Sequence, residues 1–319
     1  MLFRSAAVSV NLATQVVSGG DAAGDTVSGF EAAIGSGYDD TLTGSAGNDS
    51  IYGGAGRDTI YGGAGNDSLS GGDGSDWLYG GTGNDAIDGG GESDAIYAAA
   101  GDGTDTIIGG ETGYDYDMLL LSDPTGAGVS VTFSGTEAGS YSFASGAGGG
   151  SFSQIEGVYG GSGNDTLDYS ASTAAVSVNL ATGAASGGDA TGDSLSGFEA
   201  VVGSAQNDVL TGSAGADSLY GGAGNDMLAG GAGADVLSGG AGFDTADYSG
   251  SAAAVVVDLE TAATSGGDAA GDSLSSVEAV IGSGFDDSLS AAQSGSALYG
   301  GMGNDTLAGN SGADTLDAG

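Results

Sequence analysis

Apolar and polar positions recur along this chain with a fixed period of nine residues. Between residues 44 and 97, six nine-residue units follow one another without a gap. Each unit has Asp at its sixth position and Ile or Leu at its eighth. The first six residues of a unit are rich in Gly, which adopts positive φ freely, so they predict a turn. The last three predict a short strand whose eighth residue points inward while the seventh and ninth point outward. This periodicity predicts an all-β solenoid.

A longer repeat contains the nonapeptides. The text at 6–44 returns nearly unchanged at 174–212 and at 253–291, and a diverged copy begins at Gly126. Each copy opens with an alternating strand, followed by a Gly/Asp loop, a short β segment and a nonapeptide run. We therefore divide the chain into four sections: 1–122 with its long run at 35–97, a diverged section at 123–172, a third at 173–251, and a truncated fourth at 252–319. Both ends cut this pattern, which predicts a segment of a longer array.

The charge of the chain selects its partners. The sequence has 43 acidic residues against Arg4 and Arg57, for a net charge of −41. Such a chain should repel nucleic acid and anionic membranes and attract multivalent cations. The absence of His and Cys removes the usual zinc ligands, the common general base and the thiol nucleophile. The remaining Asp and Glu are hard oxygen ligands, which suit Ca²⁺.

Other functional classes find little support. No stretch approaches the roughly 18 apolar residues of a membrane span. The first residues lack the apolar core of a signal peptide. Without His there is no HExxH motif, and no GxSxG elbow is present. The chain is therefore predicted not to be an enzyme.

The repeats resemble those of the RTX family of haemolysin-type calcium-binding proteins, whose unit is GGxGxDxUx with U a large aliphatic residue. The resemblance implies a right-handed parallel β-roll in which two nonapeptides make one turn. Ca²⁺ then lies between turns eighteen residues apart, bound by Asp carboxylates of two successive turns and by backbone carbonyls. The first run would carry two such rows, one on each edge. Ser296 stands where Asp is expected and should weaken the pairing with Asp314. The implied ligands are Asp40, Asp49, Asp58, Asp67, Asp76, Asp85, Asp94, Asp105, Asp115, Asp165, Asp208, Asp217, Asp226, Asp235, Asp244, Asp287, Asp305 and Asp314.

The same resemblance implies a secreted or cell-surface protein, exported unfolded by a type I route and folded by extracellular calcium. Calcium binding coupled to folding is thus the predicted function. Two alternatives stand beside it. The array could be a calcium-rigidified spacer or adhesin segment of a larger surface protein, or the accessory repeat region of a secreted hydrolase or epimerase.

Two features of the sequence each allow two interpretations. The recurring loop and strand acids are either further calcium ligands or residues that shape turns and set register; they are Asp21, Asp25, Glu31 and their counterparts. Tyr61, Tyr79 and Tyr97 lie eighteen residues apart at the outward ninth position, with Trp77 on the same face. They should stack as a ladder, which either stabilises the sheet or binds a glycan or a protein.

Overall fold

The computed structural model describes residues 6–110 and 115–319 of the chain. Its regular structure consists of strands and three short 3-10 turns, η1 (Gly20–Ala22), η2 (Gly188–Ala190) and η3 (Gly267–Ala269). The chain forms two compact units, one from residues 1–131 and 137–165 and the other from 132–136 and 166–319. The division into four sections describes sequence repetition and stays a prediction. Among the described residues, no helix is long and apolar enough to cross a membrane.

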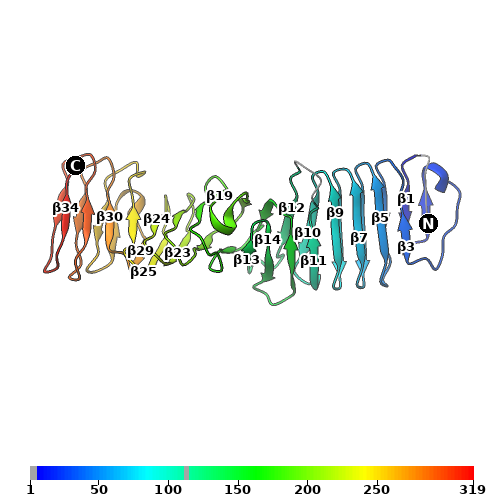
Figure 1. Cartoon of the computed structure of the whole chain (residues 1–319), viewed down its shortest axis with the longest axis horizontal. Coiled ribbons are helices and arrows are strands. Elements are labelled where there is room, and N and C mark those ends of the chain that lie inside the picture. The colour runs from blue at the N-terminus through cyan, green and yellow to red at the C-terminus, as the bar shows by residue number, and fades with distance from the viewer. Residues whose placement is uncertain (1–5, 111–114) are drawn as a thin grey trace. The chain divides into compact units, whose positions relative to one another are not determined.

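In the first unit, successive strands alternate between two parallel sheets, as Figure 1 shows for the neighbours β5, β7 and β9. One sheet contains β1 (Ser9–Asn11), β4 (Thr41–Thr43), β6 (Thr59–Ala64), β8 (Trp77–Thr82), β10 (Ala95–Ala99), β12 (Met118–Ser122) and β16 (Gly157–Tyr159). The other contains β3 (Ala32–Ile34), β5 (Ser50–Ala55), β7 (Ser68–Asp73), β9 (Ala86–Gly91), β11 (Thr104–Ile108) and β15 (Gly149–Ser153). Two antiparallel strands are added, β2 (Val16–Ser18) beside β1 and β14 (Ala138–Phe143) beside β15. β13 (Val129–Gly135) crosses the boundary between the units.

The second unit repeats this arrangement. Its first parallel series is β17 (Thr166–Asp168), β21 (Ala200–Val202), β23 (Ser218–Ala223), β25 (Val236–Ala241) and β29 (Ser273–Ser275). Its second is β18 (Ser177–Asn179), β22 (Val209–Thr211), β24 (Met227–Ala229), β26 (Thr245–Asp247), β30 (Ala279–Ile281), β32 (Ala297–Tyr299) and β34 (Thr315–Asp317). A third joins β27 (Val256–Asp258), β31 (Ser288–Ser290) and β33 (Thr306–Ala308). The antiparallel additions are β19 (Ala184–Ser186), β20 (Ser194–Ser196) and β28 (Ala263–Ser265).

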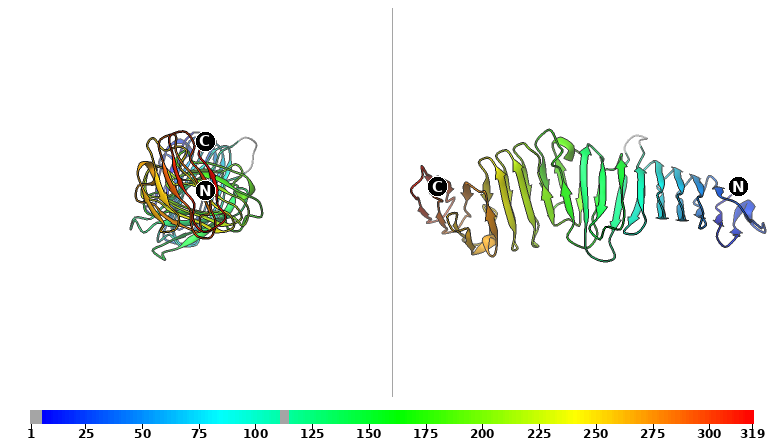
Figure 2. Two further views of the ribbon diagram at one scale, coloured as in Figure 1. Left: turned by 90° about the vertical axis from the view of Figure 1, so that its left-hand side faces the viewer. Right: turned by 90° about the horizontal axis from the view of Figure 1, so that it is seen from below.

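The predicted inward direction of the eighth position is confirmed. Ile51 pairs in parallel with Leu69, eighteen residues later, and both are 2% exposed. The strands of this run lie side by side in Figure 2. One apolar side chain per short strand therefore fills a narrow core between two sheets, and the chain is the parallel β-roll that the repeat predicts.

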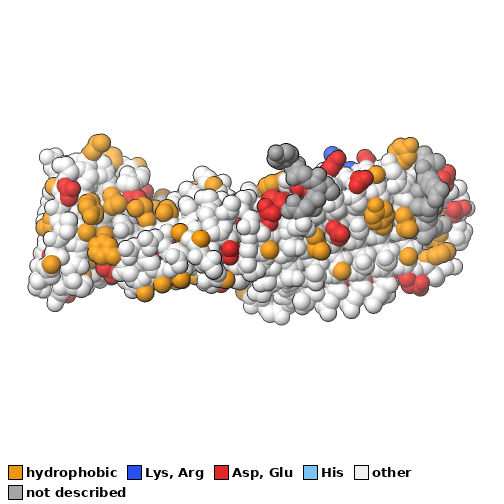
Figure 3. Space-filling view, in the orientation of Figure 1, with side chains coloured by type: hydrophobic (Ala, Val, Ile, Leu, Met, Phe, Trp, Pro, Cys, Tyr) orange, Lys and Arg blue, Asp and Glu red, His pale blue; other side chains and the backbone are white. Residues whose placement is uncertain are grey.

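The predicted aromatic ladder is also present. The rings of Tyr61 and Tyr79 stack at a centroid distance of 4.7 Å, and those of Tyr79 and Tyr97 stack at 4.3 Å. Trp77 lies on the outer face of β8, two residues before Tyr79, and is 49% exposed. The visible surface around the sheets carries many acidic side chains and almost no Lys or Arg (Figure 3).

Candidate metal centre

The sixth-position carboxylates form rows that the backbone holds together. Asp58 is fully buried, and its Oδ1 accepts a hydrogen bond of 2.7 Å from the backbone N–H of Asp40, one coil earlier. Asp58 in turn donates its N–H to Asp76 Oδ1 at 2.7 Å, and Asp76 donates to Asp94 Oδ1 at 2.7 Å. This first row confirms the predicted placement of alternate carboxylates on one edge.

The other rows follow the same rule. On the second edge of the first unit, Asp49 donates to Asp67, Asp67 to Asp85 and Asp85 to Asp105, always from N–H to Oδ1. The second unit has two rows of three and a pair, built from Asp208, Asp226 and Asp244, from Asp217, Asp235 and Asp272, and from Asp287 and Asp305. Ser296 stands in the row as expected and donates its N–H to Asp314 Oδ1 at 2.9 Å.

Four carboxylates accept the N–H of a valine of an alternating strand. Val8, Val176 and Val255 donate their N–H groups to Asp40, Asp208 and Asp287, and Val129 donates to Asp165. These valines have no carboxylate of their own to continue the row backward. The rows that begin at Asp49 and Asp217 have no such donor, since Oδ1 of each has no hydrogen-bond partner.

Glutamates end two of the rows. Asp117 donates its N–H to Glu156 Oε2 at 2.6 Å, and Asp244 donates to Glu278 Oε2 at 2.9 Å. These two glutamates thus set register by receiving the backbone of the preceding coil. Whether their other oxygens also bind metal stays a prediction.

The loop acids differ among the sections. Asp272 is buried and joins a row, because its Oδ1 accepts the Asp235 N–H at 2.9 Å. Asp268 is fixed through its backbone, since its N–H donates to Ser251 Oγ at 3.0 Å. Asp25 in the first section is exposed. The Gly/Asp loop is therefore a turn whose last acid enters the row in the fourth section.

One predicted ligand lies outside its row. Asp94 donates its N–H to Asp117 Oδ1 at 2.8 Å, so Asp117 occupies the place that the sequence analysis assigned to Asp115. Asp117 is completely buried, whereas Asp115 is half-buried. The signal was present in the sequence: an apolar residue, Leu119, follows Asp117 at a distance of two, as in every nonapeptide. Asp115 has Asp117 at that distance.

Most row carboxylates keep one buried oxygen without a hydrogen-bond partner. The serine at the second position of a unit satisfies both oxygens of Asp40, because Ser36 donates to each of them. Ser45 and Ser213 donate only to Oδ2 of Asp49 and Asp217, and units with Gly at that position have no hydroxyl group to donate. The orphaned oxygens are Oδ1 of Asp49 and Asp217 and Oδ2 of Asp58, Asp67, Asp76, Asp85, Asp94, Asp117, Asp165, Asp226, Asp235, Asp244 and Asp305.

The first-position glycine brings a second oxygen close to the orphaned one. A Cβ on Gly71 would overlap both Asp76 Oδ2 and the carbonyl oxygen of Gly89, eighteen residues later. The equivalent carboxylate and carbonyl oxygens of their own units and of the next coils lie close to Gly53 and Gly221. Only a residue without a side chain allows this approach, which explains why Gly fills this position.

These donors fit calcium. Ca²⁺ takes six to eight oxygen ligands, including carboxylates and backbone carbonyls. Among residues 6–110 and 115–319, no three His, Cys, Asp or Glu side chains form a group that could hold a metal. Carboxylates alone are therefore too few, and carbonyl oxygens such as that of Gly89 have to complete each site. An orphaned buried carboxylate oxygen is costly unless a proton or a cation satisfies it.

Burial raises the pKa of several row carboxyl groups above the ordinary value. It raises the pKa of Asp58 to about 7 and that of Asp94 to about 8, although the N–H of the preceding Asp lowers each pKa in part. Neighbouring carboxylates, such as Asp76 beside Asp58, raise it further. The pKa values of Asp76, Asp85, Asp226 and Asp235 rise to about 6 for the same leading reason.

The sign of the pH effect follows from these shifts. The folded chain without metal keeps protons that the unfolded chain, with carboxyl pKa values near 3.8, has released. The protonated carboxyls therefore stabilise the metal-free fold fully below about pH 4, and this stabilisation disappears as the pH rises through 6 to 8. A cation that binds the deprotonated form displaces the same protons.

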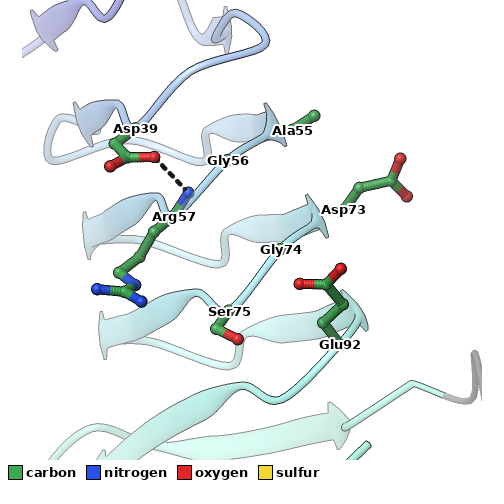
Figure 4. Close-up of a pocket in the computed structure, with 8 residues that line it drawn as sticks. All are labelled: Asp39, Ala55, Gly56, Arg57, Asp73, Gly74, Ser75 and Glu92. Carbon is green, nitrogen blue, oxygen red and sulfur yellow. Dashed lines mark hydrogen bonds between the residues drawn. The ribbon is translucent and has the colours of Figure 1, made fainter. Parts of the chain in front are cut away.

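A second group of acids lies outside the rows. Figure 4 shows a depression of about 520 Å³ on the turns, with Asp39, Arg57, Asp73 and Glu92 around it. Arg57 donates its backbone N–H to Asp39 Oδ1 at 2.9 Å. Asp39 and Glu92 are solvent-exposed and differ in this from the buried row carboxylates. This surface supplies a natural control for substitutions in the rows.

Comparison with protein families gives one match. A family model described as the RTX calcium-binding nonapeptide repeat matches residues 34–69, 70–104, 158–171, 193–228, 219–246 and 281–316, together more than half of the chain. The comparison with curated proteins found no match. The matched residues contain nearly all of the rows described above.

Proposed function

Because the chain belongs to the RTX calcium-binding nonapeptide repeat family, we propose that its carboxylate rows bind several Ca²⁺ ions and that this binding drives the array to fold. Family membership implies calcium binding. The observation that carries the rest of the proposal is the series of buried orphaned oxygens at each coil. Asp58, Asp76 and Asp94 would each supply one carboxylate to ions on the first edge, and backbone carbonyls would complete them.

Electrostatics explains why folding would wait for calcium. At neutral pH the rows place like charges one coil apart in a buried setting, in a chain of net charge −41. Calcium bound between coils removes this repulsion. A site with Kd near 10⁻⁴–10⁻³ M contributes about 1 kcal/mol at millimolar calcium, and a row adds several such terms. This dependence suits a protein that folds only after it reaches calcium-rich extracellular medium, and the proposal gives the chain a binding role without catalysis.

Calcium binding is expected to release protons. Titration calorimetry at pH 5.5, where protons stabilise the metal-free fold, should give different heats in two buffers of different ionisation enthalpy, because Asp58 and Asp94 of the folded chain must lose protons to bind metal. The variant Asp58→Asn should lose part of this release and at least one bound ion. Asp73→Asn, on an exposed turn of the same edge, should change neither. A wild-type chain that binds no calcium at 10 mM, roughly ten times the weakest Kd expected for such sites, would contradict the proposal.

A second candidate function rests on the aromatic ladder. Tyr79 and Tyr97 line a mainly apolar cavity of about 270 Å³, together with Leu120 and Asp102. Stacked rings and one carboxyl group are the components with which proteins hold a neutral sugar ring. This observation favours an adhesin role for the array over that of a spacer or of an accessory region of a hydrolase or epimerase.

Saccharide binding by the ladder is expected to be weak and specific to that sheet. On a glycan array with calcium present, Tyr97→Ala should reduce any bound signal by about tenfold, equivalent to losing one aromatic contact. Tyr52→Ala, which removes an exposed tyrosine of β5 outside the ladder, should leave the signal unchanged. An array on which the wild-type chain binds nothing contradicts this second function.

A further inference from the structure

Two carboxylates differ from the rest of their rows. Asp105 and Asp272 have both oxygens satisfied by the protein: Oδ1 accepts the N–H of the preceding row residue, and Oδ2 accepts a tyrosine hydroxyl. Tyr248 donates to Asp272 at 2.9 Å, and Tyr141 donates to Asp105 at 3.3 Å. The tyrosine hydroxyl thus meets the same oxygen that is orphaned in the neighbouring row members Asp85 and Asp235.

The carbonyl oxygen of the next coil also lies farther from the first-position glycine at these two steps. A Cβ on Gly221, in an ordinary coil, would overlap the carbonyl oxygen of Gly239 in the next coil. Gly80 and Gly230 are the first-position glycines of the units that contain Asp85 and Asp235, which are the coils before Asp105 and Asp272. The atoms nearest to a Cβ on either glycine belong to its own Asp85 or Asp235, and no carbonyl of the following coil is among them.

The spacing of the chain is also longer at these two steps. Ordinary row members are eighteen residues apart, but Asp105 follows Asp85 by twenty and Asp272 follows Asp235 by thirty-seven. Length alone does not decide the contact, because Asp117 follows Asp94 by twenty-three residues and the carbonyl oxygen of Gly109 still lies against Gly89. The tyrosine hydroxyl is therefore the feature that sets Asp105 and Asp272 apart.

We propose that Asp105 and Asp272 bind no calcium, and that the hydroxyls of Tyr141 and Tyr248 close the rows there in place of the metal. The inference rests on the proposed calcium function and concerns the two row positions that would bind no calcium. Both tyrosines are nearly completely buried, at 3% and 2% exposure. Burial, with the adjacent carboxylate, raises the pKa of each tyrosine, so the hydroxyl stays protonated and remains a donor. Tyr169 donates to Asp193 at 2.8 Å in the same manner.

The test compares two row residues of one unit. Bound calcium per chain is counted by equilibrium dialysis with radioactive calcium for the full chain, Asp226→Asn and Asp272→Asn. Asp226→Asn should lose at least one ion, whereas Asp272→Asn should keep the wild-type number. An asparagine at 272 can still accept the Asp235 N–H and can donate to Tyr248, so this variant retains its contacts. Equal loss of calcium in the two variants would overturn the inference.

A tyrosine pair separates this inference from the function on which it rests. Tyr248→Phe removes only the hydroxyl and should lower the unfolding midpoint without changing the calcium count, while Tyr220→Phe, at an exposed site on β23, should change neither. A calcium count that falls in Tyr248→Phe, or equal midpoints in the two phenylalanine variants, would overturn the inference. A wild-type chain without bound calcium overturns the proposed function instead, and the midpoints still decide whether the hydroxyl holds the row.

Discussion

Chelation of calcium at pH 7.5 is expected to abolish most of the β-sheet circular dichroism of this chain, and added calcium is expected to restore it. At that pH Asp58, Asp76, Asp85, Asp226 and Asp235 are above their pKa values, which burial raises to about 7 for Asp58 and about 6 for the others. Without a cation, both the like charges and the orphaned oxygens oppose folding.

Acid provides the control for this experiment. At pH 4 the chelated chain should regain part of its β-structure, because protons then neutralise the row carboxyls that calcium neutralises at pH 7.5. Magnesium at equal concentration should restore less structure than calcium, since Mg²⁺ demands a stricter octahedral geometry. Full β-structure in the chelated chain at pH 7.5 would contradict the coupling of folding to calcium.

Gly71→Ala is expected to destabilise the calcium-bound fold by about 3 kcal/mol or more, the upper range for overpacking of a core. The added methyl group would overlap Asp76 Oδ2 and the Gly89 carbonyl oxygen, so the two coils would have to separate. Their separation also spreads the oxygens of a calcium site. Urea unfolding at saturating calcium measures the loss of free energy, and a calcium titration measures the loss of affinity.

Gly47→Ala is the matched control for this substitution. Neither Gly47 nor Gly71 has a positive φ, so both variants avoid backbone strain and differ in space alone. The nearest heavy atom to a Cβ on Gly47 is Ser45 Oγ at 3.8 Å, an ordinary contact distance. Equal unfolding free energies for the two variants would show that the close approach of the coils at Gly71 is not required.

The nonapeptide period predicts the roll because one rule decides each coil. An apolar eighth residue must face the core, so the burial of Ile51 and Leu69 and the placement of Asp58 above Asp40 follow from position alone. The interruptions have no such rule. The segment between Asp235 and Asp272 contains a hairpin and a 3-10 turn, and the path of both depends on tertiary contacts.

The row passes through Asp117 and not through Asp115. The strand there is set by the apolar residue that enters the core. Leu119 is completely buried and therefore selects Asp117. The tyrosine partners of Asp105 and Asp272 carried no periodic signal, because Tyr141 belongs to an inserted hairpin and Tyr248 to the exit of a run.

The eighteen-residue spacing of the row hydrogen bonds also bears on how fast the array assembles. Each added coil closes a loop of one constant length, so the entropy lost per coil does not grow with the number of coils already formed. Doubling a closing loop costs only about 0.6 kcal/mol, and the step from Asp235 to Asp272 spans thirty-seven residues, roughly one doubling. Assembly can therefore advance along the chain as a succession of short local closures, and the inserted hairpin delays one step only slightly.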